Sequence, residues 1–137
     1  NRSLTTEGES QAQQTAAWLV NHGYQLDALF VSPYVRAQQT AIHLSQSLDV
    51  PITTSELIKP DSELLATVKW LEQLDLPEDA VIGLVCHMPI VGRLASFLID
   101  GDVNQGQAFH LAQAKVIELS VLAAGLGQQV ADFIPHA

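Results

Sequence analysis

Two short apolar runs, each followed closely by a proline, constrain the fold of this chain more than any other feature. The first is ALFVS at residues 28–32, with Pro33 next, and the second is AVIGLVC at residues 80–86, followed by His87. An almost wholly apolar run is typical of a strand that is covered on both faces. Because helical patterns of ten to fifteen residues lie between such runs, the sequence predicts an α/β fold around a mostly parallel sheet.

The other segments predict a three-layer sandwich with helices on both faces of the central sheet. Thr6 and Glu9 have capping-box spacing ahead of a first helix that should end near Gly23. Further helices are expected after Pro33, from Ser62 to Leu74, and after Pro89, and residues 51–59 should be extended or irregular. The C-terminal segments KVIELSVL and QQVADFI predict an antiparallel strand pair. We find no repeat or linker, so residues 1–137 are predicted to form one domain.

Composition and charge exclude several classes of partner. The formal net charge is −9 at pH 7, which argues against binding to a nucleic acid or to an anionic membrane surface. No apolar run approaches the roughly 18 residues of a membrane span. The single cysteine forms no internal disulfide, which suits a reducing compartment, so we expect a cytoplasmic protein.

Three arginines are the strongest candidates for binding an anion in so acidic a chain: Arg2, Arg36 and Arg93. Arg36 lies about one turn into the helix that should begin after Pro33, at the carboxyl end of a strand. A guanidinium beside a helix N-terminus is a good phosphate clamp. The alternative is an arginine exposed on the surface of a helix.

His87 lies where the second apolar run leaves the sheet, and three interpretations of this point are open. The histidine can be a hydrogen-bonded structural residue. It can instead be a phosphate ligand or acid–base group, since its ordinary pKa is near neutral. The third interpretation assigns the chemistry to the thiol of Cys86.

The thiol interpretation has a specific weakness in its spacing. Cysteine-dependent phosphatases place five residues between the cysteine and the arginine of their phosphate loop, whereas six separate Cys86 from Arg93. Pro89 also removes a backbone N–H that such a loop would need. A cysteine at the last apolar position of a strand is more often buried and inert, and Arg93 is expected at the surface.

The remaining histidines give no metal or catalytic signal. His22 precedes Gly23 as in a catalytic Arg-His-Gly, but it follows a helix and Asn21 replaces the arginine, so a helix end explains it. His43, His110 and His136 have no partner at metal-ligand spacing. We therefore expect no metal and no cofactor.

Three segments together resemble the histidine phosphatase superfamily, which has the phosphoglycerate-mutase-like fold. RSLTTEG at residues 2–8 is similar to the Leu-Thr-x-x-Gly segment of that family. SPYVRAQQTA at residues 32–41 is a close match to its Ser-Pro-x-x-Arg-Ala-x-Gln-Thr signature, the most specific of the three. CHMP at residues 86–89, with Val91 and Gly92, is similar to its second-histidine motif. In its small size and its lack of a large insertion, the chain resembles the SixA-like phosphohistidine phosphatases within that superfamily.

The resemblance implies a role for each candidate residue. Arg36 would clamp the phosphate, His87 would be the second active-site histidine, and Arg2 would line the phosphate pocket. The nucleophile would be a histidine in an Arg-His-Gly motif at the end of a first strand, which the given chain does not contain and which is expected upstream of Asn1. Asp61 and Glu63 are the only candidates for a general acid, and neither is supported by a motif.

The implied function is hydrolysis of phosphohistidine on a partner protein, such as a histidine phosphotransfer domain, through a phosphohistidine intermediate on the enzyme. A small-molecule phosphomonoesterase is the alternative within enzymes. A phosphate-binding module without turnover is the alternative of another class. The protein is expected to act as a monomer.

Overall fold

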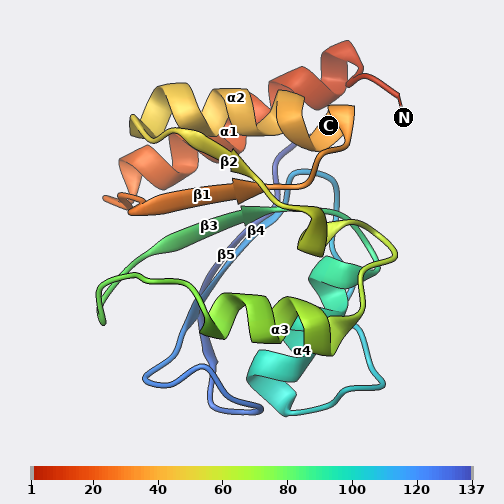
Figure 1. Ribbon diagram of the computed structural model, residues 1–137. Helices are drawn as coiled ribbons and strands as arrows, with labels where there is room; N and C mark the ends of the chain where they lie inside the picture. The colour runs from red at the N-terminus through yellow and green to blue at the C-terminus, as the bar shows by residue number, and fades with distance from the viewer. Residues whose placement is uncertain (1, 137) are drawn as a thin grey trace.

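The computed structural model describes residues 2–136 and has a three-stranded parallel sheet at its centre. The strand order is β2-β1-β3, in which β1 (Ala28–Val31) pairs with β2 (Ile52–Thr54) on one side and with β3 (Ile82–Val85) on the other. Because the strands are parallel, their carboxyl ends lie at one edge of the sheet, where the arrowheads point in Figure 1.

Helices cover both faces of this sheet, as the sequence predicts. On one face lie α1 (Thr6–Asn21) and α2 (Val35–Leu48), and on the other lie α3 (Leu64–Glu72) and α4 (Ile90–Asp100) (Figure 1). A short 3-10 turn, η1 (Glu56–Ile58), connects β2 with α3. The predicted α/β sandwich is therefore confirmed. No helix within residues 2–136 is long and apolar enough to cross a membrane.

Each helical layer has its own apolar core against the sheet. Between the sheet and the α1–α2 layer, one cluster contains Ala16, Leu29, Val31, Ala37, Ala41, Leu44 and Val50. Between α3 and α4, a second cluster contains Leu64, Val68, Leu94, Phe97 and Leu98. Apolar packing therefore fixes the sheet from both faces. Each loop at its carboxyl edge connects a packed strand with a packed helix, so both ends of the loop have fixed positions.

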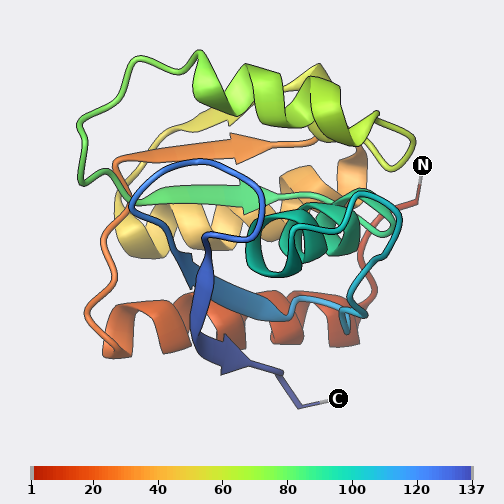
Figure 2. The same cartoon turned by 90° about the horizontal axis from the view of Figure 1, so that it is seen from below.

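The C-terminal strands form a separate antiparallel pair, which confirms the predicted pairing. They are β4 (Ala114–Glu118) and β5 (Gln128–Phe133), with a register shift between Val116 and Ile117. The pair lies on the side of β3 away from β1 (Figure 2). Within residues 2–136, β3 has no strand hydrogen-bonded to that outer edge.

The expectation that both faces of the second apolar run are covered is confirmed, because Val85 packs against the cluster under α1 and α2 and Leu84 against the cluster between α3 and α4, but the strand is not fully buried. Every residue of β3 is partly exposed, whereas Leu29, Phe30 and Val31 of β1 are buried. The physical reason for this exposure is the position of β3, which within residues 2–136 pairs only with β1 and lies at the edge of the three-stranded sheet.

The ends of two helices differ from the prediction. Thr5, rather than Thr6, caps α1, because its hydroxyl oxygen accepts the N–H of Gly8 at 3.0 Å. Glu9 does not complete a capping box, since its carboxylate contacts His43 of α2 at 2.5 Å. The third helix is shorter than the predicted 62–74 and spans Leu64–Glu72. Gly23 has φ +77, so the predicted left-handed position after α1 is confirmed.

Candidate functional site

Three of the sequence-predicted residues meet in one pocket at the carboxyl edge of the sheet. The pocket has a volume of about 230 Å³ and is lined by Arg2, Tyr34, Arg36 and His87. Tyr34 and Arg36 follow β1, His87 follows β3, and Arg2 precedes α1. Two guanidinium groups in one pocket of an acidic protein make a local positive site that suits an anion.

Arg36 lies in the first turn of α2, which begins at Val35 after the extended N-cap residue Tyr34. Its exposed side chain lines the pocket together with Arg2. The positive end of the helix dipole lies in the same turn, and it attracts negative charge. A guanidinium at this point presents a planar set of donors that fits two phosphate oxygens.

A side chain of α2 holds the segment that carries Arg2. The N–H of Leu4 donates to the side-chain oxygen of Gln39 at 2.6 Å, across 35 residues of sequence. Arg2 is two residues before this anchor and is exposed at the pocket. The hydrogen bond therefore fixes where the extended segment before α1 passes over the site.

His87 is half-buried, and its surroundings favour the neutral ring. Its Nε2 lies 2.8 Å from the hydroxyl oxygen of Ser32, and its ring centroid lies 5.1 Å from that of Tyr34. Burial, followed by the positive charge of Arg36, lowers the pKa of His87 below its ordinary 6.5. At pH 7 the ring is therefore uncharged and can act as a hydrogen-bond donor at one nitrogen and an acceptor at the other.

This lowered pKa predicts a pH dependence of stability. As the pH falls below about 6.5, the unfolded chain binds a proton at His87 before the folded chain does, so the free energy of unfolding falls. Above that pH the ring is neutral in both the folded and the unfolded state, so His87 no longer lowers the free energy of unfolding. We expect the loss of stability between pH 7.5 and pH 5 to be smaller in His87→Gln than in the unsubstituted protein. Chemical denaturation at both pH values measures it, and equal losses in the two proteins would contradict the prediction.

Cys86 does not have the properties of a nucleophile. Burial raises the pKa of its thiol to about 12, so the reactive thiolate is scarce at neutral pH. Arg93 lies outside the pocket, where its guanidinium donates to the carbonyl oxygen of Val103 at 3.2 Å. Neither the reactive thiolate of Cys86 nor a phosphate-binding position of Arg93, both of which the thiol interpretation requires, is present.

The other polar candidates lie elsewhere. His22 is the C-cap residue of α1, and its Nδ1 lies 2.8 Å from the carbonyl oxygen of Trp18, which agrees with a structural role. Asp61 and Glu63 are exposed and do not line the pocket. Among residues 2–136, no group of three or more histidine, cysteine, aspartate or glutamate side chains could hold a metal ion.

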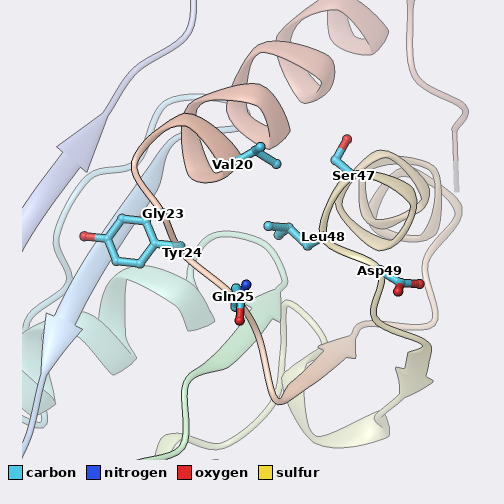
Figure 3. Close-up of a pocket in the computed structure, with 7 residues that line it drawn as sticks. All are labelled: Val20, Gly23, Tyr24, Gln25, Ser47, Leu48 and Asp49. Atoms are coloured by element: carbon cyan, nitrogen blue, oxygen red, sulfur yellow. The ribbon is translucent and has the colours of Figure 1, made fainter.

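A second cavity, of about 200 Å³, lies between the C-terminal ends of α1 and α2. Figure 3 shows Val20 and Leu48 facing each other across it. Its lining residues are Val20, Gly23, Tyr24, Gln25, Ser47, Leu48 and Asp49. Because its single charged residue is the exposed carboxylate of Asp49, this cavity lacks the cations that an anion site needs.

Sequence reasoning missed three residues that shape the pocket: Tyr34 lines it, Ser32 contacts His87, and Gln39 anchors the Arg2 segment. All three lie within residues 32–41, the segment that also carries Arg36. The signal that could have found them is the concentration of polar side chains in this short segment. A strand end and the first turns of the next helix face the same edge of a parallel sheet, so these side chains lie near one another.

The sequence comparisons agree with this geometry. The sequence model of the histidine phosphatase superfamily (branch 1) matches residues 1–59, the part that carries Arg2 and Arg36. An uncharacterised protein of Picosynechococcus is 32% identical over 125 residues, which cover 90% of this chain and 74% of that protein. The chain belongs to the histidine phosphatase superfamily.

Within the superfamily, the similarity extends to SixA proteins. Phosphohistidine phosphatase SixA of Escherichia coli is 28% identical over 103 residues, which cover 74% of this chain. The match spans 64% of the E. coli protein, just under two thirds of its length. The fold matches that of the protein histidine phosphatase SixA complexed with tungstate, with a TM-score of 0.84 at 24% identity, over 98% of this chain and 85% of the other.

Proposed function

We propose that this histidine phosphatase superfamily protein hydrolyses phosphohistidine on a partner protein. The observation that carries the proposal is the meeting of Arg2, Arg36 and His87 in one pocket at the carboxyl edge of the sheet. In this proposal an enzyme histidine attacks the phosphorus and the bond to the substrate imidazole breaks. Water then cleaves the enzyme phosphohistidine and releases inorganic phosphate.

The pocket residues have electrostatic roles in this scheme. Arg36 and Arg2 bind the equatorial oxygens of the transferring phosphoryl group, and His87 donates a hydrogen bond to one of them. Phosphoryl transfer requires mainly positioning and charge stabilisation, which fixed cations and dipoles provide without a metal. No metal or cofactor enters the scheme.

The nucleophile is assigned to an Arg-His-Gly strand upstream of Asn1. Support comes from the outer edge of β3, whose backbone groups have no strand partner within residues 2–136. A parallel strand on that edge would end beside His87, because the carboxyl ends of parallel strands meet at one edge. Its terminal histidine would then face the phosphate from the side opposite to β1.

The choice of phosphohistidine rests on the leaving group and on the relatives. Neither Asp61 nor Glu63 lines the pocket, so no carboxyl group is present among its lining residues to protonate an alkoxide leaving group. Imidazole is a better leaving group than an alkoxide and needs less protonation. The E. coli relative bears the name phosphohistidine phosphatase, and the SixA structure with the same fold holds tungstate, a tetrahedral oxyanion like phosphate.

We further propose that the substrate is a histidine phosphotransfer domain and that the protein acts as a cytoplasmic monomer with one catalytic domain. A pocket lined by four residues suits a phosphorylated side chain presented by another protein more than a small molecule enclosed on all sides.

A substrate comparison tests this proposal. The full-length protein is expected to release phosphate from a phosphorylated histidine phosphotransfer domain at a kcat/KM at least tenfold higher than from p-nitrophenyl phosphate or sugar phosphates. The reverse order would indicate a small-molecule phosphomonoesterase. Binding of inorganic phosphate with no turnover of any substrate would indicate a phosphate-binding module.

A further inference from the structure

We infer that Ser32 is a positioning residue that fixes the proton of neutral His87 on Nδ1, the ring nitrogen left to face the phosphate. The inference concerns the site of the proposed function and deepens it. It rests on the hydrogen bonds around one buried hydroxyl group, and its first test does not require catalysis.

Ser32 is held rigidly at the point where β1 and β3 leave the sheet. Its side chain is 0% exposed, and its backbone N–H donates to the carbonyl oxygen of Val85 at 3.0 Å. Its carbonyl oxygen accepts from the side-chain amide of Gln38 at 2.9 Å. Because the backbone is fixed on both sides, the hydroxyl oxygen has a fixed position 2.8 Å from Nε2 of His87.

The direction of this hydrogen bond follows from satisfying the hydroxyl proton. The Ser32 oxygen already accepts the N–H of Tyr34 at 3.4 Å, and Nε2 of His87 is the one acceptor for its proton within the described residues. A buried hydroxyl whose proton has no acceptor destabilises the folded protein, because the proton has given up its hydrogen bond to water without a replacement. The hydroxyl therefore donates and Nε2 accepts.

A neutral imidazole that accepts at Nε2 must carry its proton on Nδ1. Burial and the positive charge of Arg36 keep the ring neutral. Nδ1 has no hydrogen-bond partner within residues 2–136, and His87 lines the pocket with both arginines. The Nδ1–H group is thus the donor available to a phosphoryl oxygen, in a direction set by Ser32.

Long-range ¹⁵N–¹H NMR of the histidine rings tests the inference, with the His87 signals assigned by their loss in His87→Gln. We expect the Nδ1–H tautomer in the unsubstituted protein at pH 7.5. In Ser32→Ala we expect a shift towards the Nε2–H tautomer, which free neutral histidine prefers. Ser96→Ala removes another buried hydroxyl, 2% exposed in α4, and should leave the His87 signals unchanged. An Nε2–H tautomer in the unsubstituted protein, or an unchanged tautomer in a folded Ser32→Ala, would overturn the inference.

A second measurement separates this inference from the proposed function. Titration with inorganic phosphate is expected to show about tenfold weaker binding in Ser32→Ala than in Ser96→Ala, with amide spectra confirming that both are folded. In the full-length enzyme, Ser32→Ala should lower kcat more than it raises KM. If the tautomer changes as expected but no substrate is turned over, the proposed function fails while the assignment of Ser32 stands. Equal phosphate binding by the two variants would contradict the donor role of Nδ1–H.

Discussion

Substitution of Arg36 by alanine is expected to lower the hydrolysis of phosphohistidine by the full-length protein about 10³-fold, the magnitude typical of losing one fixed donor to a transition-state anion. The expectation follows from its place in the first turn of α2, where the guanidinium and the helix dipole point to the same pocket. Because Arg36 is exposed, stability should change little, so the loss would belong to the chemistry. Rates of phosphate release and a thermal melt measure the two effects.

Arg93→Ala is the matched control for this experiment. It removes the same positive charge from a helix of the same fold, but Arg93 lies outside the pocket and donates to Val103. Activity within about threefold of the unsubstituted protein is expected. Equal losses in the two variants would show that overall charge, rather than the clamp at Arg36, limits the reaction. Arg36→Lys should recover only a small part of the activity, since an ammonium group lacks the planar donor pair.

Substitution of His87 by alanine is expected to abolish turnover to within the assay limit, a loss of about 10³-fold or more. The ring supplies a hydrogen-bond donor that carries no positive charge at pH 7, in the same pocket as two arginines that bind by charge. Burst and steady-state kinetics with a phosphohistidine protein measure the loss. Retained turnover in His87→Ala would exclude the site assignment.

Cys86→Ser gives the control for His87, because it changes the adjacent residue in the same loop. Burial raises the pKa of the thiol to about 12, so the thiolate is scarce at neutral pH and activity should stay within about twofold. A folded but inactive Cys86→Ser would restore the thiol interpretation that the structure argues against. The two substitutions together separate the imidazole from the thiol.

Much of the fold could be predicted because the apolar pattern and the turn residues act locally. The strand ends before Pro33 and His87, the helix stop at Gly23 and the antiparallel C-terminal pair follow from periodicity and backbone preference. Whether β3 is central or at an edge could not be predicted, since an apolar run does not say how many strands pair with it. The start of α1 differs by one residue from the predicted capping box, because Thr5 caps the helix and Glu9 contacts the distant His43 instead.

Arg36 and His87 could be predicted from the sequence, whereas the hydrogen bonds that hold the site in place could not. Arg36 and His87 could be found because each follows a strand end, which the sequence shows directly. The bonds of Ser32 to His87 and of Gln39 to Leu4 join residues 55 and 35 positions apart, so they depend on packing that no local pattern encodes. The need for glycine at position 92 could not be predicted either. An added Cβ would lie 2.1 Å from the carbonyl oxygen of Gln107, which is distant in sequence.

Under the proposed function, the outer edge of β3, which has no strand partner within residues 2–136, would link folding of the sheet to activity. An open strand edge invites pairing with any extended chain, so a protein benefits from covering it early in folding. If the strand that pairs with this edge also carries the nucleophile, then the sheet and the catalytic site are completed in the same folding step. In that arrangement a molecule whose sheet is incomplete would also lack its nucleophile, so activity would measure the fraction of molecules with a complete sheet.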